Sequence, residues 1–336
     1  MEEKKIPGKN GEVYVPYEDR VSNESIVYFT RDLSKEGLQK AYKKIMSTLV
    51  GKIAVKVHTG EQHGPNIIPR SWVKYLFENE LKGATIIETN TYYKGDRYTT
   101  EDHLKTLEVN GWTFAKCDII DDKGVVNLPV NGGKWFKEMS VGKGVEDYDS
   151  LLVLTHFKGH TQGGFGGSNK NIGIGMADGR IGKGLIHTTP NQPNMWDIAK
   201  EELMERITES SKATIDYFKD KICYINVMRN MSVSCDCEGL SAEPVVTPDV
   251  GILASLDILA IDQACVDIIY SMNEKDGHAL VHRIESRHGH RQLSYMKEMN
   301  MGNHKYVMID LDNDERRMYP KDATVHLWPW KDDGQR

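Results

Sequence analysis

The chain has 336 residues, of which 39% are hydrophobic and 27% are charged. These shares are typical of globular proteins rather than of disordered or fibrous chains. The formal net charge of -6 argues against a nucleic-acid-binding protein, which normally carries a basic field. The N-terminal residues lack the apolar segment of a secretory signal, and no window approaches the roughly 20 apolar residues that span a bilayer. We therefore expect a cytoplasmic protein that binds neither nucleic acid nor membrane, with an oligomer left open.

Strands and helices are predicted to alternate along the first half of the chain. Apolar, β-branched runs predict strands, and apolar residues at helical spacing predict helices. The expected strands are 26–29, 52–58, 84–88 and 150–155, and the expected helices are 38–49, 69–81 and 101–110. The NGG sequence at 131–133 predicts a hairpin. This alternation is typical of a mainly parallel sheet covered by helices, in which ligands bind at the carboxyl ends of strands.

The second half continues the same pattern. Helical segments are expected at 196–218, 259–270 and 278–302, and strands at 221–227, 249–255 and 306–309. Because single cores stop growing at roughly 250–300 residues, we expect two α/β lobes around a cleft. The predicted division is a tail over 1–24, lobes over 25–195 and 196–325, and a tail over 326–336. The ordered fold is expected to begin at Ser25.

The segment from Thr155 to His187 is rich in glycine. Glycine costs roughly 0.5–1 kcal/mol in regular structure, so such density indicates unusual backbone angles or a close approach to another group. Backbone amides freed in this way form anion-binding nests. We expect such a nest at Gly163, Gly164, Gly166 and Gly167. Close packing of a strand against a helix is the alternative.

Basic and amide side chains accompany these glycines. They are His156, Lys158, His160, Asn169, Lys170, Asn171 and His187. A lysine near other cations has a lowered pKa and acts as a nucleophile or covalent anchor, which we expect of Lys170. His160 and His187 are candidate proton carriers or metal ligands. His156 follows a strand, so a structural hydrogen-bonded role competes there with a direct one.

Polar loops after two predicted strands add further candidates. His58 directly follows a buried strand and is a candidate catalytic residue, whereas His103 is expected at the surface. Thr91, Lys94 and Arg97 lie in the next strand-end loop. The two cations offer charge-assisted donors for a carboxylate or phosphate.

The five cysteines include no CxxC pair, which excludes a ferredoxin-type cluster supplied by this chain. Cys235 and Cys237 face the same side of an extended backbone, about 7 Å apart by strand rise. Two such thiols bind a soft metal, with buried inert cysteines as the alternative. Asp257 is expected to cap a helix, and Asp262 lies inside an apolar helix, where it is a candidate for orienting a site residue.

Several of these segments resemble one known family, the bacterial and archaeal domain of unknown function 362, often labelled iron-sulfur centre proteins. The resemblance runs from about Ser25 to Asp310, through KVHTGE (56–61), ETNTYYKG (88–95), HFKGHTQGGFGGSNKNIGIG (156–175), Cys235-Asp-Cys237 and PDVGILASLDILAIDQACVD (248–267). Many members carry a ferredoxin insertion after the position of His187. This chain continues directly into the predicted 196–218 helix, so it resembles the subfamily without the insertion.

A more local resemblance is to the lactate racemase family, which uses a nickel pincer cofactor. His160, the glycines at 163–167, Lys170 and His187 follow in that family's order. The resemblance implies that His160 is an acid/base, that Lys170 anchors the cofactor and that His187 ligates the metal. The family's arginine-containing signature near the N-terminus is absent here, so a substrate carboxylate would need another partner, such as Arg97.

Two functions follow from these patterns. The first is an enzyme that acts on a small anionic substrate or cofactor by metal-assisted proton or hydride transfer, as racemases and epimerases do. The alternative is a cofactor- or cluster-binding redox module that receives electrons from a separate partner protein.

Overall fold

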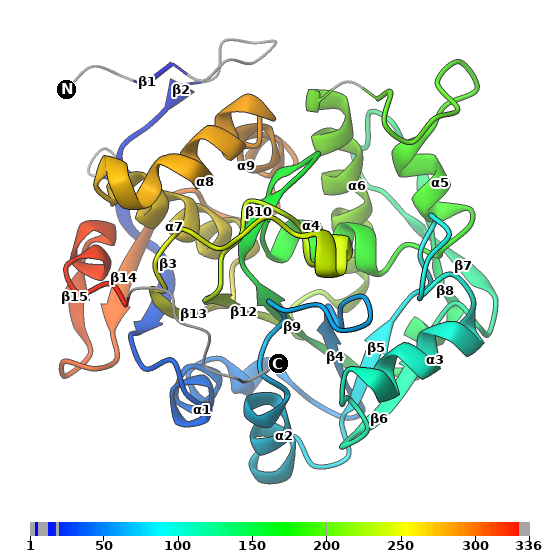
Figure 1. Cartoon of the computed structure of the whole chain (residues 1–336), viewed down its shortest axis with the longest axis horizontal. Helices are drawn as coiled ribbons and strands as arrows, with labels where there is room; N and C mark the ends of the chain where they lie inside the picture. The colour runs from blue at the N-terminus through cyan, green and yellow to red at the C-terminus, as the bar shows by residue number, and fades with distance from the viewer. Residues whose placement is uncertain (1–3, 6–12, 18–19, 199, 329–336) are drawn as a thin grey trace.

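A single nine-stranded sheet forms the centre of the molecule (Figure 1). The computed structural model describes residues 4–5, 13–17, 20–198 and 200–328, so much of the two predicted tails lies outside the described residues. The strand order is β15-β14-β3-β13-β12-β9-β4-β5-β6. Neighbouring strands are parallel except at β15–β14, β3–β13 and β13–β12. The expected α/β class, with a mainly parallel sheet covered by helices, is confirmed.

The bounds of the elements follow the apolar patterns of the sequence closely. The strands of the sheet are β3 (Val21–Thr30), β4 (Ile53–Val57), β5 (Thr85–Glu88), β6 (Lys116–Ile119), β9 (Ser150–His156), β12 (Ile222–Met228), β13 (Gly251–Ser255), β14 (Tyr306–Asp310) and β15 (Arg316–Met318). The helices are α1 (Lys35–Lys43), α2 (Arg70–Asn79), α3 (Thr100–Val109), α4 (Ser168–Gly175), α5 (Gly182–His187), α6 (Lys200–Phe218), α7 (Ile258–Ser271), α8 (Glu274–Ser286) and α9 (His290–Glu298). The predicted hairpin around 131–133 joins β7 (Val125–Pro129) to β8 (Glu138–Gly142).

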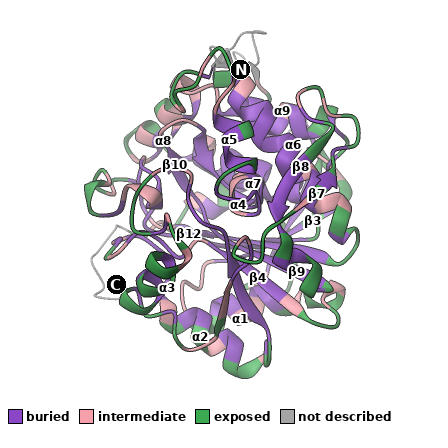
Figure 2. Cartoon of the chain, turned by 90° about the vertical axis from the view of Figure 1, so that its right-hand side faces the viewer, coloured by how far each residue is buried: buried purple, intermediate pink, exposed green. Residues whose placement is uncertain are grey.

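Helices cover both faces of the sheet (Figure 2). Alternate residues of a strand point to opposite faces, so each central strand supplies two cores. Val57 and Leu154 pack with α1 and α2, whereas Ala54 and Val153 belong to the core shared with α4, α6 and α7. Among the described residues, no helix is both long and apolar enough to cross a membrane.

Strands from both predicted lobes belong to the same sheet. β3 from the first lobe lies between β13 and β14 from the second, and β9 pairs with β12. The predicted division between residues 195 and 196 therefore does not separate two sheets. As a division into folding units it stays a prediction.

The first strand of the sheet begins before Ser25, where the ordered fold was expected to begin. Arg20 and Tyr17 are buried and anchor this segment to the C-terminal half. The Arg20 guanidinium lies 2.6 Å from Asp267 Oδ2, and the Tyr17 hydroxyl donates to the carbonyl of Tyr306 at 3.1 Å. Sequence periodicity missed this segment because its partners are almost 250 or more residues away.

The helical segment expected over 278–302 is two helices. α8 ends at Ser286 and α9 begins at His290. Between them His288 adopts a positive φ of 59°, which interrupts helical backbone. The turn places Gly289 against Gly164, where an added Cβ on Gly164 would lie 2.8 Å from the Gly289 Cα.

Candidate functional site

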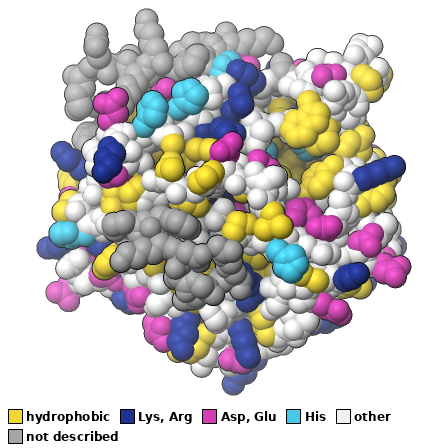
Figure 3. Space-filling model, viewed as in Figure 1, with side chains coloured by type: hydrophobic (Ala, Val, Ile, Leu, Met, Phe, Trp, Pro, Cys, Tyr) yellow, Lys and Arg dark blue, Asp and Glu magenta, His cyan; other side chains and the backbone are white. Residues whose placement is uncertain are grey.

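A cavity of about 450 Å³ lies at the carboxyl ends of β4, β5 and β9. Figure 3 shows a hollow with hydrophobic side chains at its rim, in the region that Figure 1 places between α5 and α6. The predicted site residues that line it are His58, Thr91, Arg97, Lys158, His160, Gly166, Gly167, Lys170, Asn171, His187 and Cys237. The fold thus brings together side chains from loops that are up to 179 residues apart, His58 and Cys237 being the extremes.

The glycine-rich segment folds into a small hairpin followed by a helix. β10 (Lys158–His160) pairs with β11 (Gly164–Gly166), and α4 begins at Ser168. The buried carboxylate of Asp262 on α7 accepts hydrogen bonds from the amides of Ser168 at 2.7 Å and Asn169 at 2.9 Å. The protein itself therefore supplies the anion at this helix N-terminus, and Asp262, a candidate for orienting a site residue, holds the start of this segment.

The predicted anion nest at Gly163, Gly164, Gly166 and Gly167 is not found. The amide of Gly163 donates to His160 Nδ1 at 2.8 Å, and Gly164 and Gly166 pair within the hairpin. A Cβ on Gly167 would lie 2.4 Å from Asp262 Oδ1. These glycines permit close packing, which is the alternative reading of the pattern, and any positive charge for a ligand comes from side chains.

Cys235 and Cys237 lie with His160 where the loop after β12 meets the β10–β11 hairpin, and we call these three residues the sulfur cluster. Cys235 immediately precedes the short helix Asp236–Ser241, and its Sγ lies 3.4 Å from the backbone nitrogen of Cys237 and 3.6 Å from Lys170 Nζ. A hydrogen bond from the Cys237 thiol, the charge of Lys170 and a hydrogen bond from His160 hold the pKa of Cys235 well below its usual value despite burial. The same contact and burial raise the pKa of Cys237. Cys235 Sγ contacts both the backbone N–H of Cys237 and Lys170 Nζ, which favour negative charge on this sulfur, so Cys235 is the thiolate of the pair.

His160 is the hydrogen-bond donor beside this thiolate. Its Nδ1 accepts from the amides of Gly163 at 2.8 Å and Gln162 at 3.2 Å. A neutral imidazole that accepts at Nδ1 carries its proton on Nε2, which leaves Nε2–H for the Cys235 sulfur. Burial, then the charge of Lys170, lowers the pKa of His160, so the ring is neutral near pH 7.

Lys170 and Lys183 have opposite electrostatic settings. Burial alone would lower the pKa of Lys170, but the sulfurs of Cys235 and Cys237 outweigh it and raise that pKa. The expected lowered pKa of Lys170 is therefore wrong, because the sequence did not reveal the thiolate next to it. Burial lowers the pKa of Lys183 to about 7.

Lys158 and His156 share the carboxylate of Asp236. Lys158 Nζ and His156 Nδ1 lie 3.0 and 2.9 Å from Asp236 Oδ2. His156 Nε2 also contacts the carbonyl of Arg229 at 2.6 Å, so both ring nitrogens are engaged within the protein and its role is structural. Lys158 and Lys170 each have one hydrogen-bonding or ion-pair partner among the described residues, which leaves N–H groups for a ligand.

A second buried ion pair, which the sequence analysis missed, lies under the cavity. Lys56 Nζ is 2.7 Å from Glu88 Oε2, and His58 Nδ1 is 3.6 Å from Glu88 Oε1. Burial opposes the charge of Glu88, but Lys56 and His58 hold its pKa well below the usual value. In the sequence, Lys56 and Glu88 each look like a charge at the solvent-exposed edge of an apolar strand. The signal that could have revealed the ion pair is that each strand carries one charged residue within an otherwise apolar run.

Other predicted site residues are engaged elsewhere. Arg97 Nη2 pairs with Glu61 Oε1 at 2.7 Å, so its charge is already matched. Lys94 is exposed and does not line the cavity. Asn169 is fully buried and donates to Thr208 Oγ1 at 3.1 Å. Thr91 donates to the carbonyl of Tyr93 at 2.9 Å.

His187 lines the cavity without joining the sulfur cluster. His160, Cys235 and Cys237 place ligand atoms within 4.8 Å of one another, and in the described part of the chain His187 belongs to no such group. Its Nδ1 is buried and has no hydrogen-bond partner among the described residues. Burial lowers its pKa to about 3, so the ring is neutral and one nitrogen is available to a bound molecule.

The family of the chain is established by its sequence. The model of the family described as domain of unknown function (DUF362) matches residues 53–267. The chain therefore belongs to this family. No curated protein matches it.

Two solved structures are distantly similar. The lactate racemase apoprotein from Thermoanaerobacterium thermosaccharolyticum is 13% identical, with a TM-score of 0.39, over 92% of this chain and 88% of that one. A crystal structure of a structural genomics target from Thermotoga maritima is 16% identical, with a TM-score of 0.35, over 57% of this chain and 49% of that one. Similarities this distant do not bear on what the cavity does.

His103 provides a test of the buried electrostatics beside the site. It is fully buried, not at the surface as expected, and burial lowers its pKa from 6.5 to about 3. Below pH 6.5 His103 is protonated in the unfolded chain, but in the folded chain it stays neutral until about pH 3. The free energy of unfolding therefore falls as the pH is lowered from 6.5 to 3. At pH 4.5 this costs about 2–3 kcal/mol.

We expect His103→Gln to lose less free energy of unfolding between pH 7.5 and pH 4.5 than the parent chain does, as measured by urea denaturation. The control is His278→Gln, at an exposed histidine. An identical pH dependence in His103→Gln and the parent chain would contradict the assignment.

Proposed function

We propose that this protein is an enzyme that moves a proton to and from a carbon of a small anionic substrate, as racemases and epimerases do. One observation carries the proposal: the Cys235 sulfur, with a strongly lowered pKa, lies beside a neutral His160 and a charged Lys170, both of which line the cavity, while Cys235 itself is fully buried against them. A thiolate held by a neighbouring hydrogen-bond donor and a cation is the arrangement of a reactive cysteine.

The substrate class follows from the unused donors. Lys158 and Lys170 both line the cavity and keep N–H groups that the described residues leave unfilled. A carboxylate placed between them receives charge-assisted hydrogen bonds. Ile174, Leu203 and Ile207 form an apolar wall for the remainder of the molecule.

The proposed proton transfer balances within these groups. Cys235 Sγ takes the proton from the carbon next to the carboxylate, and the electron pair of the broken C–H bond moves onto the carboxylate oxygens. Lys170 and Lys158 stabilise that added negative charge. His160 Nε2–H supports the sulfur while it is charged, and the return of a proton to the carbon completes the exchange.

Alkylation tests this arrangement without a known substrate. At pH 6.5 we expect iodoacetate to modify Cys235 at least about tenfold faster than Cys117, because burial raises the pKa of Cys117 to about 12. Lys170→Met should slow the reaction of Cys235, because loss of the adjacent cation raises the pKa of the thiol and lowers the thiolate fraction at pH 6.5. Mass spectrometry of the modified peptides measures both rates.

Two comparisons sharpen the alkylation experiment. The rate with anionic iodoacetate relative to neutral iodoacetamide should be higher at Cys235 than with free cysteine, and Lys170→Met should lower this ratio. Lys94→Met, at an exposed lysine of a neighbouring loop, should change neither the alkylation rate of Cys235 nor the ratio of the two reagents. A Cys235 that stays unmodified at pH 6.5, or that is unaffected by Lys170→Met, contradicts the proposal.

A soft transition metal bound by the sulfur cluster is the second candidate, favoured by the three ligand atoms within 4.8 Å. Two thiolates suit such an ion, which would supply Lewis acidity when bound. His160 fits less well, because its Nδ1 accepts two amide hydrogen bonds and its Nε2 therefore carries the proton. Two forms of this candidate differ in what the metal does. In the first, a pincer cofactor is anchored by Lys170 and its metal is held by His187. In the second, the protein is a redox module that receives electrons from a partner protein.

Metal analysis and intact mass of protein purified without oxygen distinguish the candidates. If the protein is the thiolate enzyme, we expect an unmodified mass and less than about 0.1 metal ion per chain, both in the parent chain and in Cys235→Ser. A stoichiometric metal, lost in Cys235→Ser and Cys237→Ser but kept in Cys117→Ser, would establish the metal candidate. Iron with sulfide would favour the redox module, and an added mass lost in Lys170→Ala would favour the pincer.

A further inference from the structure

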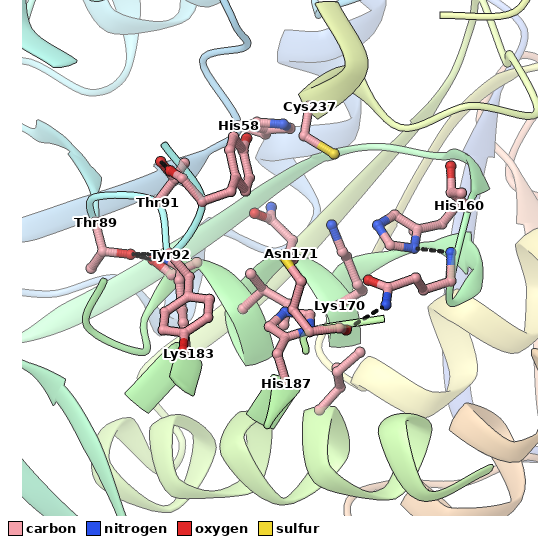
Figure 4. Close-up of a pocket in the computed structure, with 18 of the residues that line it drawn as sticks. His58, Thr89, Thr91, Tyr92, His160, Lys170, Asn171, Lys183, His187 and Cys237 are labelled. Atoms are coloured by element: carbon pink, nitrogen blue, oxygen red, sulfur yellow. Dashed lines mark hydrogen bonds between the residues drawn. The ribbon is translucent and has the colours of Figure 1, made fainter. Parts of the chain in front are cut away.

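Lys183 lies on the side of the cavity away from the sulfur cluster. Figure 4 shows Thr89 and Lys183 on one side and His160 on the other, with Lys170, Asn171 and His187 between them and Cys237 above Asn171. Lys183 lines the cavity, and only 5% of the residue is exposed. Neither the family's description nor the proton transfer proposed above gives this lysine a role.

The hydrogen bonds of Lys183 can be satisfied by a neutral amine. Its Nζ donates to Thr89 Oγ1 at 2.6 Å and to the carbonyl of Asn90. Thr89 Oγ1 donates its own hydrogen to the carbonyl of Gly175 at 3.1 Å, so toward the lysine it only accepts. A neutral amine has two N–H bonds and one lone pair. With both N–H bonds directed at these oxygens, the lone pair is left for the cavity.

The nearest carboxylates do not neutralise Lys183. Asp121 accepts the amides of Asn90 at 3.1 Å and Gly179 at 2.8 Å. Glu88 pairs with Lys56 at 2.7 Å. Among the residues that the structure describes, Lys183 forms no ion pair, and burial together with Arg97 and Lys56 lowers its pKa to about 7 although Asp121 and Glu88 oppose this.

The backbone around Lys183 is built to hold it in place. Asp178 accepts the amides of Ile181 at 2.9 Å and Gly182 at 2.8 Å, which fixes the start of α5. A Cβ on Gly182 would lie 2.1 Å from the carbonyl oxygen of Ser140, so glycine lets α5 press against β8. A long side chain on such a support loses little further freedom when it reacts.

We propose that Lys183 is a nucleophile that captures the carbonyl group of a ligand as an imine. The Nζ lone pair attacks the carbonyl carbon, the C=O bond opens to a hydroxyl, and water leaves as the C=N bond forms, with both hydrogens of the water supplied by the amine. Protonated, the imine nitrogen keeps one N–H for Asn90 or Thr89. The ligand class is a small aldehyde or ketone, and a 2-oxo acid also offers a carboxylate to Lys158 and Lys170.

This inference goes beyond the proton transfer at Cys235 and stands without it. It uses no sulfur and no metal, and its lysine belongs to the opposite side of the cavity (Figure 4). A failure of imine capture and a failure of the thiolate can therefore be told apart, because reductive trapping reports on Lys183 and alkylation reports on Cys235.

Reductive trapping tests the proposal on the whole chain. The protein is incubated at pH 7 with pyruvate and sodium cyanoborohydride, which reduces an imine to a stable secondary amine, and the modified lysines are mapped by mass spectrometry. We expect Lys183 to be modified at least about tenfold more than exposed Lys94, because the neutral fraction of an ordinary lysine at pH 7 is far smaller.

Variants then assign the signal. Lys183→Met should abolish the dominant adduct, whereas Lys94→Met should keep it. Mapping the parent chain needs no variant, so the proposal remains testable if Lys183→Met does not fold. Modification spread over exposed lysines, with Lys183 no more modified than Lys94, would overturn it.

Discussion

The buried carboxylate of Asp262 is the constraint on which the cavity depends. It accepts the first two amides of α4 and the side-chain amide of Asn226 at 2.8 Å, so it ties together α7, α4 and β12. Because the carboxylate occupies the helix N-terminus, no external anion is needed there, and Gly167 must lack a Cβ. Lys170 and Asn171 follow in the same turn and are thereby fixed against β4 and β9, where Asn171 Nδ2 donates to Thr155 Oγ1 at 2.9 Å and Asn171 Oδ1 accepts from Lys56 at 3.2 Å.

Most charged side chains around the cavity form ion pairs with a residue of opposite charge. Lys170 and Lys183 are exceptions. Lys56 with Glu88, Arg97 with Glu61, and Lys158 with Asp236 are buried pairs that would be costly to break. Lys170 is matched by a thiolate instead of a carboxylate. A thiolate held beside a cation is the form of cysteine that reacts as a nucleophile, which is the role proposed for Cys235. Lys183 differs from these pairs, because burial lowers its pKa to about 7 and no ion pair among the described residues offsets this.

The sequence predicted the architecture better than the site. Apolar runs such as KIAVKV and LLVLTH, and the cap at Asp257, located strands and helices to within a few residues in most cases, because these signals are local. The Gly, His and Lys segment was also found, since it is contiguous. Partners could not be predicted in the same way. Arg97 was expected to be available to a carboxylate, but it pairs with Glu61, and Lys170 was expected beside other cations, but its partner is Cys235, 65 residues away. No signal in the sequence singled out Lys183. What a charged side chain does depends on contacts that only the tertiary fold creates.

The central claim is that Cys235 is a thiolate in the resting protein, and thiolate absorbance in the ultraviolet tests it without requiring reagent access. The difference in absorbance between the parent chain and Cys235→Ser is recorded from pH 5 to pH 9. The account predicts a difference of one thiolate that is already present at pH 6 and that shifts to higher pH in Lys170→Met. A difference that develops only above about pH 8, the range of an ordinary cysteine, would contradict it.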